Sequence, residues 1–145
     1  MDRRSFTGFH FEFAGTSVNW ESKKQRTVAL SSTEAEYMGL TEATKDAIYL
    51  TRLSRELGME IDAPITIYND NQGAKKLAEN PIFHSRSKHI DMRHHFVREA
   101  REKGQVCIEY LPTELMPADV LTKALNGPKH SLCSEKMGLS RIKTK

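Results

Sequence analysis

The order of strand-like and helix-like patterns limits most strongly what this chain can fold into. Apolar Phe9, Phe11 and Phe13 alternate with polar residues, which is the period of a strand with one buried face. We expect these side chains and Trp20 to lie in the core. Later segments have the apolar spacing of helices, so the whole order is strand, strand, helix, strand, helix, helix, strand, helix. This order predicts one α/β domain at residues 1–127, followed by a basic tail at 128–145 with room for one short helix.

Capping and breaking residues set the expected boundaries of the elements. Ser31 and Glu34 form the S-x-x-E pattern of a capping box, and Gly58 is placed to end the long helix that follows. Asp91 is expected to cap a later helix that ends at Gly104. The other elements are expected at residues 9–13 and 18–20 (a hairpin), 65–68, 72–79, 106–111 and 117–125.

Composition narrows the class of protein. A chain of 145 residues buries enough surface to fold without disulfides, and its two cysteines fit a reducing compartment. It has neither an apolar run of membrane-spanning length nor a signal peptide, so membrane and secreted classes are not expected. We therefore expect an intracellular protein, in a cytoplasmic particle or in the nucleus.

The net charge of +3 is mild, but the charges are unevenly distributed. Acids outnumber bases between Ser31 and Asp62, and bases outnumber acids between His84 and Gly104. This distribution suits a protein that holds cations and a polyanion together. Two solvated helix faces of opposite charge would produce the same pattern.

Three acids stand out by their expected positions at the ends of elements. Glu36 lies in the first turns of the long helix, Asp70 directly follows the strand at 65–68, and Asp119 lies in the helix that begins near Pro117. Ligand sites gather at the carboxyl edge of an α/β sheet, where neighbouring carboxylates repel one another unless a cation binds between them. Hard oxygen ligands suit Mg²⁺, and two such ions support phosphodiester cleavage. Among 19 acids, however, three at element ends are unsurprising.

Four ordered motifs add a family resemblance. They are VALSSTEAEY at 28–37, YNDNQ at 68–72, KHIDMRHHFVRE at 88–99 and ADVLTK at 118–123. Together they closely resemble the ribonuclease H domain of the copia-type LTR retrotransposon Pol polyprotein, over about residues 3–139. The resemblance implies an RNase H-like fold, a mixed sheet of five strands flanked by helices. It also implies cleavage of the RNA strand of an RNA–DNA hybrid during reverse transcription, with two Mg²⁺ ions held by four carboxylates.

The same resemblance assigns the site residues. Glu36 matches the helix glutamate, Asp70 the aspartate after a strand, and Asp119 the last aspartate, while Glu34 is better used in the capping box. The family's fourth carboxylate lies on the first, central strand, which precedes the segment matching residues 2–5. We therefore expect this chain to lack that strand, and Asp2 matches a loop position that does not replace it. The implied partners are the RNA–DNA hybrid and an upstream reverse transcriptase in the same polyprotein.

Nucleic-acid contacts are expected beside these acids. Asn71 and Gln72 could reach 2′-hydroxyls or minor-groove edges, and capping of the following helix explains them equally well. Basic side chains suited to phosphates follow the same region. They are Lys75, Lys76, Arg86, Lys88 and Arg93. The histidines at 84, 89, 94 and 95 match no common zinc spacing, so a zinc site is not expected.

Three functions remain open from the sequence. The first is an Mg²⁺-dependent endoribonuclease that acts on hybrids. The second is a truncated remnant without catalysis, in which the missing strand weakens metal binding. The third is a co-opted module that binds nucleic acid or a partner through its basic residues.

Overall fold

A computed structural model describes residues 2–79 and 88–142. These residues form four strands, four α-helices and two short 3₁₀ helices, which confirms the expected mixed α/β class and is compatible with an RNase H-like fold. The chain divides into two units, Met1–Ala29 with Thr113–Lys145, and Leu30–Pro112. We call them the hairpin unit and the helical unit, and each is described by itself. No helix in the described ranges is both long and apolar enough to cross a membrane.

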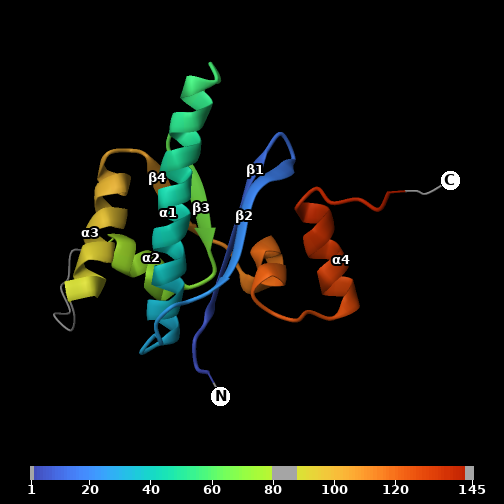
Figure 1. The fold of residues 1–145 in the computed structure, drawn as a ribbon, viewed down its shortest axis with the longest axis horizontal. Helices are drawn as coiled ribbons and strands as arrows, with labels where there is room; N and C mark the ends of the chain where they lie inside the picture. Colours follow the sequence, from blue (N-terminus) through green and yellow to red (C-terminus); the bar gives the residue numbers. More distant parts are fainter. Residues whose placement is uncertain (1, 80–87, 143–145) are drawn as a thin grey trace. The chain divides into compact units, whose positions relative to one another are not determined.

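The helical unit is built on a pair of parallel strands. Strand β3 (Ile65–Asn69) pairs with β4 (Val106–Tyr110), with Ile65 opposite Val106 and Asn69 opposite Tyr110. Parallel strands need a crossover connection, and this one carries the helices α2 (Gln72–Glu79) and α3 (Lys88–Glu102). The long helix α1 (Ser32–Glu56) packs with both helices and with both strands (Figure 1).

Local signals explain the ends of α1. The Ser31 hydroxyl accepts a hydrogen bond from the backbone N–H of Glu34 at 3.0 Å, as the capping box predicts. The Glu34 carboxylate accepts from the backbone N–H of Leu30 at 2.6 Å, one residue earlier than the usual partner. At the other end, Gly58 takes a φ of +75°, which ends the helix as expected.

The core of the helical unit comes from one face of each helix and from the strands. The expected apolar positions Leu40, Ala43 and Ala47 of α1 are buried. They are joined by small and branched side chains of the other elements. These are Ile67, Ala74, Ala78, Val97, Ala100, Val106 and Ile108. The buried face of α2 consists of Ala74 and Ala78, so this helix can approach the strands closely.

Helix α3 begins earlier than the sequence predicts. Its first residue is Lys88, so Asp91 lies inside the helix and the expectation that Asp91 caps it is wrong. Acidic residues are favoured both at the cap and in the first turn of a helix, so the sequence alone does not separate the two placements. The predicted stop is confirmed, because Gly104 follows the helix with a φ of +68°.

The hairpin unit begins with two antiparallel strands, β1 (Phe6–Phe13) and β2 (Thr16–Lys24). Ala14 and Gly15 form the two-residue turn, both with positive φ, as a tight hairpin requires. Strand β2 extends beyond the expected 18–20, because its polar continuation stays paired with β1 as far as Phe6 opposite Lys24. The described strands form two separate sheets of two strands each, and no described strand pairs with both.

The aromatic residues of the hairpin are only partly in the core. Phe9 is buried, but Phe13 is 51% exposed and Trp20 is 61% exposed, so the expectation that both lie in the core is wrong. A bulge between Phe11 and Glu12 breaks the alternation of faces before Phe13. Trp20 is paired with the half-buried His10. Because His10 lies between Phe9 and Phe11 in β1, its side chain and that of Trp20 point to the opposite face of the hairpin from these two phenylalanines.

The C-terminal segment folds back onto the hairpin. The helix expected at 117–125 is a short 3₁₀ helix, η2 (Pro117–Leu121), preceded by η1 (Thr113–Leu115). It ends where Thr122 and Lys123 both donate backbone hydrogen bonds to the carbonyl of Asp119. The expected short helix of the tail is present as α4 (Gly127–Lys136), and beyond it the Met137 carbonyl accepts from the backbone N–H of Ser17 at 3.0 Å.

Contact between η2 and β1 leads to a prediction about stability. A Cβ atom placed on Gly8 would lie 2.5 Å from Thr122 Cγ2 and 2.9 Å from Leu121 Cβ. We therefore expect Gly8→Ala to lower the free energy of unfolding by about 1–3 kcal/mol, measured by urea denaturation. Gly127→Ala is the control, because a Cβ there meets nothing within 4 Å. Equal unfolding midpoints for the two variants would contradict this packing.

Candidate functional site

Two of the three candidate carboxylates lie at the same end of the helical unit. Glu36 is an exposed residue in the second turn of α1, and Asp70 is half-buried directly after β3. The starts of α1 and α2 meet here, because a Cβ on Gly73 would lie 3.1 Å from the Thr33 hydroxyl. Thr33 precedes Glu36 by three residues, which places both on neighbouring positions of the helix surface. Glu36 and Asp70 each also interact with other residues.

The chain around Asp70 is held by a series of side-chain hydrogen bonds. Buried Asn69 accepts the backbone N–H of Asn71 through its Oδ1 at 2.7 Å. Asn71 in turn accepts the backbone N–H of Ala74 at 3.0 Å and so caps α2. Asn71 therefore has the capping role that the sequence left open for it. Gln72 is the exposed first residue of the helix. These bonds fix the backbone on both sides of Asp70.

The third carboxylate has a different environment. Asp119 belongs to η2 in the hairpin unit and is only 5% exposed. Its Oδ2 lies 2.9 Å from Lys129 Nζ, and its Oδ1 lies 3.3 Å from Lys123 Nζ. The hydrogen bond to Asp119 raises the pKa of Lys129 above its ordinary value. Asp119 is therefore a carboxylate compensated by two ammonium groups.

The donor chemistry fits Mg²⁺ only in part. Glu36 and Asp70 offer the hard oxygen atoms that this ion prefers and share one unit. Both oxygens of Asp119 have ammonium partners instead. Within residues 2–79 and 88–142, no group of three or more His, Cys, Asp and Glu side chains could hold a metal ion. The assignment of Glu36, Asp70 and Asp119 as metal ligands remains a prediction.

The fourth acid considered from the sequence, Asp2, is engaged elsewhere. Its carboxylate lies 2.9 Å from Arg4 Nε and 2.8 Å from Lys24 Nζ. These partners lower the pKa of Asp2 well below its usual range, with the Arg4 hydrogen bond as the largest cause. Asp2 therefore has a local ion-pairing role beside the hairpin, consistent with a loop position.

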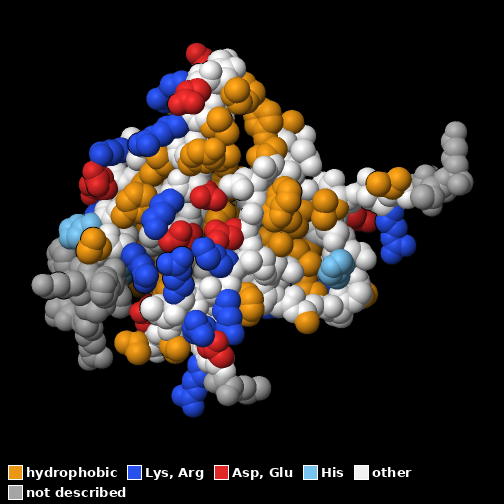
Figure 2. All heavy atoms as spheres, in the orientation of Figure 1, with side chains coloured by type: hydrophobic (Ala, Val, Ile, Leu, Met, Phe, Trp, Pro, Cys, Tyr) orange, Lys and Arg blue, Asp and Glu red, His pale blue; other side chains and the backbone are white. Residues whose placement is uncertain are grey.

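The candidate phosphate-binding residues differ in exposure and in whether their charge is already paired with a carboxylate. Lys75 lies 3.4 Å from Glu109 Oε2 and 3.8 Å from Glu79 Oε1, so its charge is already compensated. Lys76 is exposed on α2, and Arg93 is half-buried on α3. Arg86 and the side chain of Lys88 lie outside the described residues. On the face shown in Figure 2, basic and acidic side chains are interspersed, so many basic groups there have acidic neighbours.

One of the clustered histidines has a role in packing. The His94 ring stacks on buried Tyr37 at a centroid distance of 4.2 Å and an interplanar angle of 25°. Burial raises the pKa of Tyr37 above its ordinary value. His84 and the side chain of His89 lie outside the described part of the chain. Because Tyr37 follows Glu36 directly, this stack links the start of α1 to α3.

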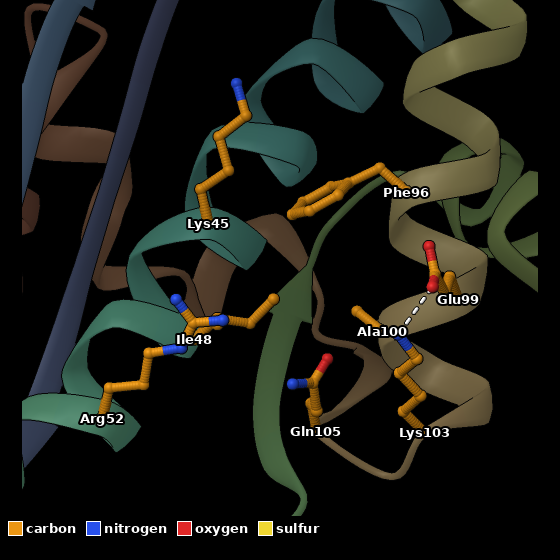
Figure 3. A pocket seen from close by; sticks show the side chains of 8 residues that line it. All are labelled: Lys45, Ile48, Arg52, Phe96, Glu99, Ala100, Lys103 and Gln105. Atoms are coloured by element: carbon orange, nitrogen blue, oxygen red, sulfur yellow. Dashed lines mark hydrogen bonds and ion pairs between the residues drawn. The ribbon is translucent and has the colours of Figure 1, made fainter.

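A cleft of about 290 Å³ opens between α1 and α3 (Figure 3). Apolar Ile48, Phe96 and Ala100 line it together with the cationic Lys45, Arg52 and Lys103. Lys103 pairs with Glu99 at 2.6 Å and Lys45 with Glu42 at 2.9 Å. Two of its three cations are thus compensated, and neither Glu36 nor Asp70 lines it.

Comparison with known proteins adds a relationship that geometry alone does not give. The chain is 41% identical over 138 residues to the retrovirus-related Pol polyprotein from transposon TNT 1-94 of Nicotiana tabacum. It is 36% identical over 141 residues to the corresponding polyprotein from transposon RE1 of Arabidopsis thaliana. The chain is a homologue of one segment of transposon Pol polyproteins. These alignments cover 95% and 97% of the chain but only 10% of each relative.

The homology to a Pol polyprotein segment is supported by sequence alone. A shorter stretch of 53 residues, 37% of each chain, is 60% identical to the secreted RxLR effector protein 161 of Plasmopara viticola. No protein-family model matches the chain. No solved structure matches it either.

The capping role of Asn71 gives a prediction that separates folding from binding. Asn71→Ala removes the acceptor of the Ala74 N–H, so we expect a loss of about 1 kcal/mol in the free energy of unfolding. Gln72→Ala, at the adjacent exposed position, is expected to stay within about 0.5 kcal/mol of the parent chain. Urea denaturation of the three proteins measures both changes. Equal losses for the two variants would argue against the cap.

Proposed function

We propose that this chain is the ribonuclease H-type segment of a copia-type Pol polyprotein and cleaves the RNA strand of RNA–DNA hybrids. The observation that carries the proposal is that Glu36 and Asp70 both belong to the end of the helical unit where the starts of α1 and α2 converge. The similarity to transposon Pol polyproteins over nearly the whole chain supports it.

Glu36 and Asp70 would hold divalent ions in this proposal, while Asp119, which belongs to the other unit, is assigned the same role by the family resemblance alone. Bound Mg²⁺ would supply an activated water and stabilise the leaving oxygen of the phosphodiester. The chain's own groups have complementary tasks. The hydrogen bonds of Asn69 and Asn71 hold the Asp70 backbone in place, which limits the reorganisation needed on binding. Since Asn71 Oδ1 caps α2, its amide Nδ2 is the group left to reach a 2′-hydroxyl.

The basic side chains would position the hybrid without reading its sequence. Lys76 and Arg93 are the described candidates with no ion pair to a described carboxylate. Contacts from such groups go to phosphates and carry no base specificity. That property suits an enzyme that must accept any hybrid sequence.

A second candidate is a non-catalytic module that binds nucleic acid or a partner. The observation that favours it is the state of Asp119, whose two oxygens already hold Lys123 and Lys129. A local identity of 60% to a protein of a different name fits the reuse of part of this sequence elsewhere. The two candidates differ in whether Asp70 is needed for hybrid cleavage.

Substitution of Asp70 tests the nuclease. We expect the chain to cleave a hybrid with a labelled RNA strand in Mg²⁺, and Asp70→Asn to lose about 100-fold or more of the rate, because the amide is a poor metal ligand. Asp62→Asn is the matched control, an exposed acid before β3 outside the site. Cleavage that is equal in the Asp70 variant, or absent in all three proteins, would favour the non-catalytic module.

Salt dependence tests the phosphate contacts. We expect hybrid affinity to fall as salt rises, because phosphate contacts release counterions. The double variant Lys76→Ala with Arg93→Ala should make the slope of log K against log salt shallower by about 1–2. Fluorescence anisotropy measures the slope, and Lys136→Ala with Arg141→Ala removes two exposed cations of the hairpin unit as a control. Equal slopes in both double variants would reject Lys76 and Arg93 as contacts.

A further inference from the structure

Basic side chains gather at the open end of the hairpin, where β1 begins and β2 ends. The pairing continues past the strands, because the backbone N–H of Gln25 donates to the Ser5 carbonyl at 2.8 Å. Residues 2–6 and 21–26 therefore lie side by side, where the N-terminal segment runs into β1 (Figure 1). Together they contain five basic and two acidic residues, so we call this region the basic end of the hairpin. The basic residues are Arg3, Arg4, Lys23, Lys24 and Arg26.

Two of these cations share one carboxylate. Asp2 lies 2.9 Å from Arg4 Nε and 2.8 Å from Lys24 Nζ, so it joins the segment before β1 to the end of β2. A single carboxylate neutralises only one of the two charges. It also orders two long side chains, which lowers the conformational entropy that binding an anion would otherwise cost. Arg3 and Arg26 are exposed and make no ion pair with a carboxylate of the described residues.

An exposed aromatic ring accompanies the cations. Phe6 is paired with Lys24, and residues paired across antiparallel strands point to the same face. Phe6 is 50% exposed. A ring of this kind beside cations suits an unpaired base, which stacks on the ring while the neighbouring phosphates contact the basic groups. The core of a protein–protein interface is depleted of charge, so the same surroundings suit a protein partner less well.

We propose that the basic end of the hairpin binds single-stranded nucleic acid, with the Phe6 ring stacked on a base and the neighbouring cations on its phosphates. The cations that the structure places beside the ring are Lys24, its cross-strand partner, and Arg4, which shares Asp2 with Lys24. A duplex or a hybrid keeps its bases stacked on one another, so it offers this surface phosphates alone. The site uses none of the residues of the proposed nuclease, and all of its residues belong to the hairpin unit.

Binding of a short labelled oligouridine by the whole chain, measured by fluorescence anisotropy, tests the stacking. We expect Phe6→Leu to weaken binding about 5-fold or more, because the substitution keeps an apolar side chain and removes the ring. Phe13→Leu is the matched control, since Phe13 is 51% exposed on the same strand but lies at the turn end of the hairpin. An oligothymidine of the same length shows whether the strand bound is RNA, DNA or both.

The loss in Phe6→Leu should be confined to single strands, because a duplex has no free base to stack. No binding of either single strand by the parent chain would overturn the proposal. Equal affinities of the two leucine variants for the single strand would do the same, as would an equal loss by Phe6→Leu for the single strand and for a duplex of its length.

Salt dependence tests the cations separately from the ring. We expect Arg4→Gln with Lys24→Gln to make the slope of log K against log salt for oligouridine shallower by about 1, because phosphate contacts release counterions. Lys136→Gln with Arg141→Gln removes two exposed cations elsewhere in the hairpin unit as the control. Equal slopes in the two double variants would reject the basic end of the hairpin as the place where the phosphates bind.

Photocross-linking in the parent chain gives a measurement that does not depend on a variant folding. An oligouridine that carries 5-iodouracil cross-links to aromatic side chains that contact its bases, and tandem mass spectrometry of the peptides locates the modified residue. We expect the cross-link at Phe6. A cross-link confined to other residues, or no cross-link at all, would overturn the proposal.

Discussion

The parallel pairing of β3 with β4 is the constraint on which the helical unit depends. A single ladder between two short strands is not stable alone, so the pair exists only because helices cover it. The crossover between the strands supplies α2 and α3, and α1 completes the layer. The same arrangement places Asp70 at the end of β3 and brings the start of α2 against Thr33 of α1. Burial of the strands thus determines where Glu36 and Asp70 lie.

Signals within a few residues predicted much of this fold. The capping pair Ser31 and Glu34 located the start of α1, and Gly58 located its end. Helix α2 has the bounds expected from its sequence. In each case the deciding hydrogen bonds join residues close in the chain, so the sequence contains both partners side by side.

Features that depend on distant partners were not predictable in the same way. The exposure of Trp20 depends on whether another element covers its face of the hairpin, and no local pattern contains that information. The packing of the end of η2 against Gly8 joins positions more than a hundred residues apart in the chain. The start of α3 was mispredicted for a different reason. An aspartate such as Asp91 is favourable both as a cap and inside the first turn, so its position does not fix where the helix begins.

The candidate site shows the same difference between features set by nearby residues and features set by distant ones. Glu36, Asp70 and Asp119 could be selected from motifs, and the capping role of Asn71 from its position after a strand. Lys123 could have been considered as a partner of Asp119 at a spacing of four residues. Lys129 could not, because it lies ten positions after Asp119, beyond the irregular segment 122–126 and in another helix.

That difference also explains why Lys129 matters more than Lys123 for the chemistry of Asp119. The Lys123 ammonium group is more than half exposed, so water screens much of its charge from Asp119. Lys129 is shielded on most of its surface and positioned by a capped helix, so the chain does not have to order it when the pair forms. Water competes less for such a group, and its charge acts on Asp119 at fuller strength. Asp119 is therefore paired with an ammonium group that the packing of α4 holds in place.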